Sequence, residues 1–187
     1  MNTVEILEKL IAFDTVSRNP NIELIGFISA LLESKGVATT ILQDSTGSKA
    51  NLYATIGDQQ TAGVMLSGHT DVVPVDGQAW TRPPFELTLE DGLYYGRGTA
   101  DMKGFVAAAL ASALQACDRK LKTPLHLAFS YDEEIGCVGV RSVIDMLDKA
   151  PVRPALCIIG EPTNLTVATG HKGKTGLHAV CRGREGH

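Results

Sequence analysis

The sequence predicts an α/β fold with a largely parallel central sheet flanked by helices. Apolar, β-branched segments of strand length alternate with longer segments of helical periodicity, which is typical of a parallel sheet with helices on both faces. The segment Ala155–Ile159 is nearly all apolar, as expected of a strand buried on both sides. The helical segment Met102–Lys120 is rich in alanine, which allows close packing against a sheet. A chain of 187 residues can bury a substantial core.

The chain begins with two predicted helices, over residues 3–13 and 21–35, where apolar residues recur at helical spacing. Asn21 can cap the second helix at its start, and Gly36 can close its end. Three segments of β-branched and apolar residues then predict strands: Val37–Leu42, Asn51–Ile56 and Val64–Ser67.

A hairpin and two further elements complete the pattern. Glu86–Leu89 and Leu93–Tyr95 flank the turn dipeptide Asp91-Gly92, which predicts a β-hairpin. A strand is expected over Leu125–Tyr131 and an amphipathic helix over Val138–Lys149. In open sheets of this kind ligands bind beyond the carboxyl ends of the strands, so functional side chains are expected there.

Charge and hydropathy exclude several classes of protein. With 17 basic and 21 acidic residues and no basic run, the chain does not resemble a nucleic-acid-binding protein. It has no apolar stretch of about 20 residues that could span a membrane, and its acidic start does not resemble a signal peptide. We therefore expect a cytoplasmic protein that binds neither nucleic acid nor membrane.

The four cysteines form no pair with metal-ligand spacing. They are far apart in the sequence, so a zinc ribbon has no support, and reduced thiols are expected in a cytosolic protein. These residues are Cys117, Cys137, Cys157 and Cys181.

His69 and Asp71 follow the predicted strand Val64–Ser67 and are the first candidates for a functional site. A metal-bound imidazole usually gives its other N–H to a carboxylate, which Asp71 could supply. Taken alone, a histidine after a strand is more often an ordinary polar residue, and Asp71 could serve an Asx turn or a helix cap. The pair gains weight from the acidic residues that follow other predicted strands.

Four further acidic residues stand at such positions. Asp101 precedes the alanine-rich helix, so it could cap that helix or bridge two cations. Glu133 and Glu134 could be a solvated pair, the first turn of a helix, or a metal ligand beside a base. Glu161 follows an apolar strand, and Pro162 favours an extended conformation for it. One histidine and several carboxylates at strand ends are what a hydrolytic metal site requires.

Other kinds of site are poorly supported. The stretch from Gly96 resembles a nucleotide-binding glycine loop, but Asp101 occupies the final glycine position. No Gly-x-Ser-x-Gly motif occurs, and no cysteine has a suggestive histidine setting, so nucleophilic catalysis is not indicated. His126 lies within a predicted strand and is expected to be structural, while His171 and His178 lack acidic neighbours at ligand spacing.

Four segments that carry these residues occur in the order found in a known family of two-zinc amidohydrolases and exopeptidases. The family includes acetylornithine deacetylases, succinyl-diaminopimelate desuccinylases, aminoacylases and dipeptidases, and the chain is most similar to its bacterial acetylornithine deacetylases. The resemblance covers the chain from Met1 to His187. The matching segments are Ser67–Pro74, Gly96–Gly104, Asp132–Gly136 and Gly160–Thr163.

The resemblance implies a site for two zinc ions, with Co²⁺ as a possible substitute. His69 and Glu161 would hold one ion, Glu134 would hold the second, and Asp101 would bridge them. A cis peptide bond is expected between Asp101 and Met102. The implied fold is a zinc-exopeptidase-like catalytic domain.

The resemblance also implies the catalytic groups and the reaction. Glu133 would act as general acid and base, and Asp71 would orient His69. His187 would reach the partner subunit's active site and stabilise the oxyanion. The implied reaction is hydrolysis of N2-acetyl-L-ornithine to ornithine and acetate in arginine synthesis, with other N-acyl amino acids or dipeptides as alternative substrates. A non-catalytic metal-binding module is the alternative from a different class.

Relatives of this kind carry a second zinc histidine far downstream and an inserted lid domain that mediates homodimer formation. By this comparison residues 1–173 are the first part of an incomplete catalytic domain. Residues 174–187 would be the first strand of the lid, because Lys174–Arg182 alternates like a strand. We therefore expect a truncated chain with weak zinc binding and negligible activity of its own.

Overall fold

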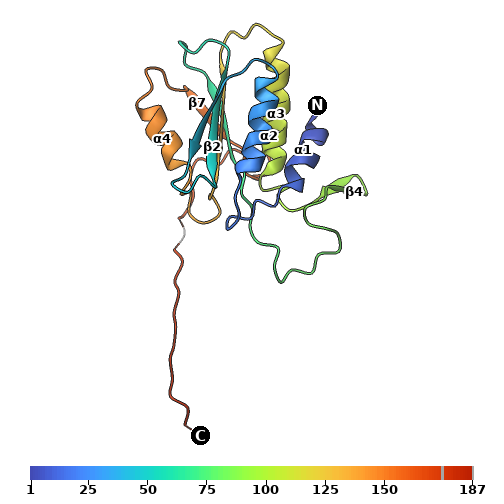
Figure 1. Ribbon diagram of the computed structural model, residues 1–187, viewed down its shortest axis with the longest axis vertical. Coiled ribbons are helices and arrows are strands. Elements are labelled where there is room, and N and C mark those ends of the chain that lie inside the picture. The colour runs from blue at the N-terminus through green and yellow to red at the C-terminus, as the bar shows by residue number, and fades with distance from the viewer. Residues whose placement is uncertain (174, 187) are drawn as a thin grey trace.

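A five-stranded sheet forms the centre of the computed structural model, which describes residues 1–173 and 175–186 (Figure 1). The strand order across the sheet is β1-β2-β6-β3-β7. The strands are β1 (Thr39–Gln43), β2 (Ala50–Ile56), β3 (Val64–His69), β6 (Leu125–Ser130) and β7 (Leu156–Ile159).

Most strands of this sheet run in one direction. β3 pairs in parallel with both β6 and β7, whereas β2 pairs antiparallel with both β1 and β6. Because β1 and β6 both oppose β2, strands β1, β6, β3 and β7 share one direction. The predicted α/β fold with a largely parallel sheet is confirmed.

Helices cover both faces of the sheet (Figure 1). On one face lie α2 (Ile22–Glu33) and α3 (Lys103–Cys117), and α1 (Thr3–Ala12) packs against α3. The short helix α4 (Arg141–Asp148) lies on the other face and contacts β2. Four alanines of α3 are buried, as the alanine-rich sequence predicts, whereas Ala108 is exposed; the buried ones are Ala107, Ala109, Ala111 and Ala113. Between this helix layer and the sheet lies one continuous apolar core.

The predicted cap of α2 forms at its C-terminal end but not at its N-terminal end. Gly36 adopts a φ of +74° and donates to the carbonyl of Glu33, while Val37 donates to the carbonyl of Leu32. These two bonds form the expected glycine C-cap. Asn21 occupies the N-cap position but makes no capping hydrogen bond. Its side chain bonds instead to both backbone groups of Ala50, so it ties α2 to the start of β2.

The predicted hairpin is a separate two-stranded sheet of β4 (Thr88–Glu90) and β5 (Leu93–Tyr95). Asp91 and Gly92 form its turn, with φ values of +51° and +76°. Positive φ at both central residues matches the right-handed twist of hairpin strands, which is why Asp-Gly is favoured there.

Two expectations about exposure and boundaries are wrong. β7 is expected to be buried on both sides, but it lies at the edge of the described sheet. Leu156, Ile158 and Ile159 are therefore 55%, 44% and 63% exposed. α4 begins at Arg141, because the preceding residues form turns. No strand forms over residues 175–182, which extend away from the sheet without a pairing partner (Figure 1).

Two simpler findings concern composition. All four cysteines are free thiols, as expected. Among the described helices, none has the length and apolar character needed to cross a membrane.

Candidate metal centre

The predicted site residues meet at the carboxyl edge of the parallel strands. His69 is the last residue of β3 and pairs with Ser130 at the end of β6. Glu133 and Glu134 follow β6, and Glu161 follows β7. Because these three strands are adjacent and parallel, their ends lie at the same edge and bring the side chains together.

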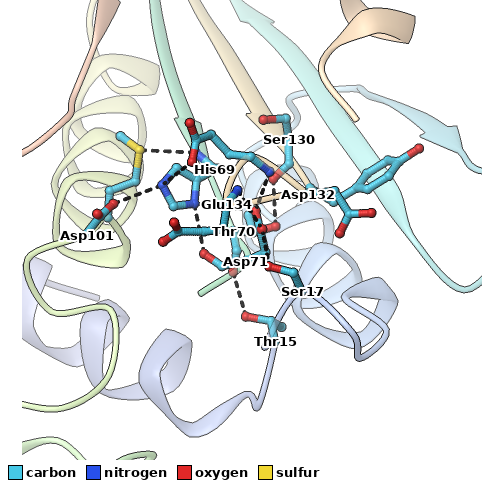
Figure 2. Close-up of polar contacts among 12 residues, drawn as sticks. Thr15, Ser17, His69, Thr70, Asp71, Asp101, Ser130, Asp132 and Glu134 are labelled. Atoms are coloured by element: carbon cyan, nitrogen blue, oxygen red, sulfur yellow. Dashed lines mark hydrogen bonds and ion pairs between the residues drawn. The ribbon is translucent and has the colours of Figure 1, made fainter. Parts of the chain in front are cut away.

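His69 is held in one orientation by Asp71, two positions further along the chain. Its side chain is only 2% exposed, and its Nδ1 lies 2.9 Å from the main-chain oxygen of Asp71 (Figure 2). A carbonyl oxygen can only accept a hydrogen bond, so Nδ1 must carry the proton. The Nε2 atom is thereby directed toward the carboxylates. It lies 3.0 Å from Asp101, 3.9 Å from Glu133 and 3.8 Å from Glu161.

Two groups of side chains in this cluster could hold a metal ion, and His69 belongs to both. In each group the candidate ligand atoms lie within 4.8 Å of one another. Imidazole nitrogen and carboxylate oxygen are ligands that Zn²⁺ and related divalent ions accept, so the donor set fits such an ion. One group adds Glu133 and Glu161 to His69, and the other adds Asp101 and Glu134.

The electrostatics of the cluster also fit a cation. Burial raises the pKa of Glu134, and the negative charge of Asp101 adds to the rise. Burial likewise raises the pKa of Glu161. The charge of His69 works against this rise, and the charges of Asp101 and Glu133 increase it. Burial alone would lower the pKa of His69, but its hydrogen bond to Asp71 and the surrounding carboxylates raise it to about 9. The cluster therefore favours positive charge at its centre.

Asp71 is buried and has more partners than a simple orienting carboxylate needs. Its Oδ1 lies 3.5 Å from Nδ1 of His69, whereas its main-chain oxygen lies 2.9 Å from the same nitrogen. Oδ1 accepts from the backbone N–H of Glu133, and Oδ2 accepts from Ser17 Oγ and the N–H of Glu134. Burial works to raise the pKa of Asp71, but the hydrogen bonds from His69, Ser17 and Glu133 outweigh it and lower the pKa. Asp71 thus contacts both His69 and the turn after β6.

Asp101 is not a helix cap. Met102 occupies the N-cap position of α3, and no side chain caps that helix. The side chain of Asp101 is 48% exposed and accepts from His69 instead. The peptide bond between Asp101 and Met102 is cis, as the family resemblance implies.

Glu133 and Glu134 lie on an irregular turn and not in a helix, since α4 starts only at Arg141. Asp132, before them, has a φ of +55°, and the N–H groups of Gly136 and Cys137 fold back onto the carbonyl of Glu133. The two adjacent acids accordingly fall in different metal-capable groups. Glu133 is also within 3.4 Å of the Cys137 thiol, which donates to its Oε1.

The remaining histidines take no part in the described cluster. His126 is buried at the opposite end of β6 and shares its Nδ1 with Tyr53 and Thr55, which fits the expected structural role. His171 and His178 lie in the exposed segment after β7. The role predicted for His187 falls outside the described residues.

Sequence reasoning missed three residues that support the site. Ser17 donates to Asp71, Lys49 pairs with Asp132, and Lys103 donates to the carbonyls of Leu10 and Phe13. Lys103 is fully buried at the start of α3. Burial lowers its pKa to about 7, although the charges of nearby acids oppose this. Lysine side chains are rarely fully buried, so no sequence pattern indicated these contacts.

Comparison with known proteins identifies related chains. A family model described as peptidase family M20/M25/M40 matches residues 65–173, which contain His69, Asp71 and the four candidate metal-binding carboxylates. Acetylornithine deacetylase from Shigella sonnei (strain Ss046) is 38% identical over 191 residues, covering 98% of this chain and 49% of the relative. The acetylornithine deacetylase from Pasteurella multocida (strain Pm70) is 37% identical with the same coverage. The chain therefore spans about half the length of the curated relatives it matches.

Solved structures share the fold. Human carnosine dipeptidase 1 superposes with a TM-score of 0.71 at 25% identity, covering 84% of this chain and 38% of that protein. An M20 family metallo-carboxypeptidase from Sulfolobus solfataricus gives a TM-score of 0.73 at 25% identity, covering 86% and 37%.

Proposed function

This chain belongs to peptidase family M20/M25/M40, and on that premise we propose that it supplies a metal site to an amide hydrolase. The reaction we propose is removal of the acetyl group from N2-acetyl-L-ornithine, giving ornithine and acetate in arginine synthesis. The relatives from Shigella sonnei and Pasteurella multocida, named acetylornithine deacetylases, support this choice of substrate.

The observation that carries the proposal is one buried imidazole surrounded by four carboxylates. Nε2 of His69 lies within 4 Å of Asp101, Glu133 and Glu161, and Glu134 shares a metal-capable group with it. So many acids around one buried nitrogen repel one another, and a divalent cation offsets that repulsion.

We assign the metal ligands as follows. His69 and Glu161 would hold one Zn²⁺ and Glu134 would hold a second, with Asp101 shared between them; Co²⁺ could take their place because it accepts the same donors. When bound, such ions polarise the amide carbonyl and lower the pKa of a water molecule.

Glu133 is the general base and acid in this proposal. Its carboxylate accepts a proton from the water whose oxygen attacks the carbonyl carbon. It then gives the proton to the amine nitrogen as the C–N bond breaks, so that acetate and ornithine leave. Its side chain is 37% exposed, which leaves it accessible to substrate. Asp71 keeps the Nδ1 proton of His69 in place and thereby directs Nε2 toward the ligand position.

The domain organisation that we propose comes from the family resemblance. Residues 1–173 belong to the catalytic domain, and residues 174–187 begin an inserted lid through which the longer protein forms a homodimer. His187 would act from that lid on the partner subunit's active site.

A second candidate substrate class is peptides or other N-acyl amino acids. The similar solved structures include a dipeptidase and a carboxypeptidase, which supports this alternative. Assays of the full-length protein with acetylornithine, succinyl-diaminopimelate and dipeptides would separate these substrates. Preference for acetylornithine supports the deacetylase, and preference for another substrate overturns it.

Metal binding tests the proposal at its base. Titration calorimetry of this chain with Zn²⁺ should show binding that His69→Ala abolishes. In the full-length protein, Glu133→Ala should reduce turnover by about 10²–10⁴-fold while Zn²⁺ still binds. A Zn²⁺ affinity that is the same in His69→Ala and wild type would contradict the metal site. Near-normal turnover of Glu133→Ala would contradict the assigned base.

A further inference from the structure

The turn that carries Glu133 and Glu134 is held by a lysine from another part of the chain. Lys49, just before β2, donates from Nζ to Asp132 Oδ1 at 2.6 Å and to the main-chain oxygen of Ser17 at 2.5 Å. The side chains of Lys49 and Asp132 are only 16% and 12% exposed. A charge pair so shielded from water is stronger and more directional than one on the surface.

Both acceptors of Lys49 belong to segments that also contact Asp71 (Figure 2). Ser17 donates from Oγ to Asp71 Oδ2 at 2.7 Å. Its backbone N–H donates to Val72, and Val72 donates back to Thr15, so this segment runs beside the residues after β3. Lys49 therefore connects the turn after β6 with the segment Thr15–Ser17, which hydrogen-bonds to Val72 and supports Asp71.

Asp71 holds the same turn through the backbone N–H groups of Glu133 and Glu134. Its carboxylate accepts the backbone N–H of Glu133 at 3.1 Å and that of Glu134 at 3.3 Å. The turn is thus fixed at two places, by its backbone through Asp71 and by the Asp132 side chain through Lys49. Asp132 has a φ of +55°, which residues other than glycine rarely adopt, so the side-chain contact helps to keep it there.

We propose that Lys49 is a positioning residue for the metal centre. By holding Asp132 and Ser17 together, it sets where the carboxylates of Glu133 and Glu134 lie relative to His69. The inference rests on the proposed function, since it assigns Lys49 a role in that same site. Outer contacts of this kind change metal affinity by about 10–100-fold when they are removed.

A matched control is available elsewhere in the chain. Lys35 also pairs with an aspartate, Asp118, at 3.0 Å and 3.1 Å, but the side chains are 39% and 67% exposed. That pair joins the end of α2 to the end of α3, away from the carboxyl edge of the sheet. Lys35→Met therefore removes the same chemical groups without touching the turn.

The experiment compares wild type, Lys49→Met, Lys49→Arg and Lys35→Met. The first readout is Co²⁺ affinity. It is measured from the visible absorption of the bound ion, which also reports the geometry of its ligands. The second is hydrogen exchange of the Glu133 and Glu134 amides in the metal-free protein, measured by NMR. Thermal unfolding of each variant controls for general loss of stability.

We expect Lys49→Met to weaken Co²⁺ binding by about 10–100-fold, alter the absorption spectrum and speed exchange of the two amides selectively. Lys49→Arg keeps a cation that can reach both acceptors and should restore most of the affinity. Lys35→Met should match wild type. Asp132→Asn, which keeps the side-chain volume, should act in the same direction as Lys49→Met and serves if that variant does not fold.

Other outcomes separate the two proposals. Unchanged Co²⁺ affinity and unchanged amide exchange in Lys49→Met and Asp132→Asn would overturn the role of Lys49. So would faster exchange spread evenly over the chain, because that result describes a general stabiliser. If wild type itself binds no Co²⁺, the proposed function fails, and exchange of the two amides still decides whether Lys49 holds the turn.

Discussion

Asp71 accepts a hydrogen bond from the backbone N–H of Glu133, although the two residues are 62 positions apart in the sequence. The carboxylate beside His69 thus also holds the turn that follows β6. One side chain sets the position of the acids relative to the imidazole. This dual contact makes Asp71 more important to the geometry of the site than an orienting partner of His69 alone would be.

Asp71→Asn should weaken Zn²⁺ binding by about 10–100-fold. An asparagine has one accepting oxygen, whereas Asp71 uses both oxygens to accept from Ser17, Glu133 and Glu134. Its NH₂ group would face a donor, so part of the turn would be released. Titration calorimetry measures the affinity.

The control for this variant is Asp76→Asn. Asp76 is an exposed aspartate that pairs with Arg18, with side chains 65% and 55% exposed. Its replacement should leave the affinity for Zn²⁺ unchanged. Equal affinities of Asp71→Asn and wild type would show that the turn does not depend on this carboxylate.

Gly160→Ala should destabilise the protein by about 1–3 kcal/mol and weaken metal binding. A Cβ atom at Gly160 would lie 1.9 Å from the ring of Phe105 in α3, so the helix or the end of β7 must move. Glu161 is the next residue and would move with the strand end. Urea unfolding and Zn²⁺ titration report the two effects.

Gly170→Ala is the matched control for that substitution, since no atom lies within 4 Å of its Cβ position. It should behave as wild type in both measurements. A Gly160→Ala protein as stable as this control would mean that Phe105 moves aside at little cost.

Gly26→Ala should stabilise the protein by about 0.5–1 kcal/mol. Gly26 is an exposed residue in the middle of α2, and an added Cβ would meet no atom within 4 Å. Alanine restricts the unfolded chain more than glycine does and fits a helix better. A lower urea midpoint than wild type would contradict this expectation.

The metal-free protein should draw stability from protonated His69. Its pKa is raised from 6.5 to about 9 in the folded chain, so this contribution is complete below pH 6.5. It is lost as pH rises through about 9, because the neutral imidazole no longer attracts the surrounding carboxylates. His69→Asn should therefore be less stable than wild type at about pH 6, with the difference shrinking by about pH 9.5.

Urea unfolding in the presence of a chelator measures this difference. Lys103, with a pKa lowered to about 7 by burial, titrates in the same range but is present in both proteins. Its contribution cancels when the two are compared. A stability difference that is constant or grows with pH would contradict the assigned charge state of His69.

Particular elements show why the fold was predictable. The apolar periodicity of α2, the alanines of α3 and the Asp-Gly turn between β4 and β5 each reflect local physical chemistry that a sequence records. The exposure of β7 was not predictable, because an apolar strand looks the same whether it lies inside a sheet or at its edge. Asn21 shows the same limit: its side chain suits a helix cap, but Ala50 offers both a donor and an acceptor to it.

By itself the sequence determined the kind of chemistry at this site. A histidine and four acids at the ends of strands and the start of a helix indicate a metal centre, since residue type and local position are both written in the chain. Only the tertiary structure decided how those groups are held. Lys49, Ser17 and Asp71 come from separate segments, and their contacts with the turn after β6 exist only when the sheet brings those segments together.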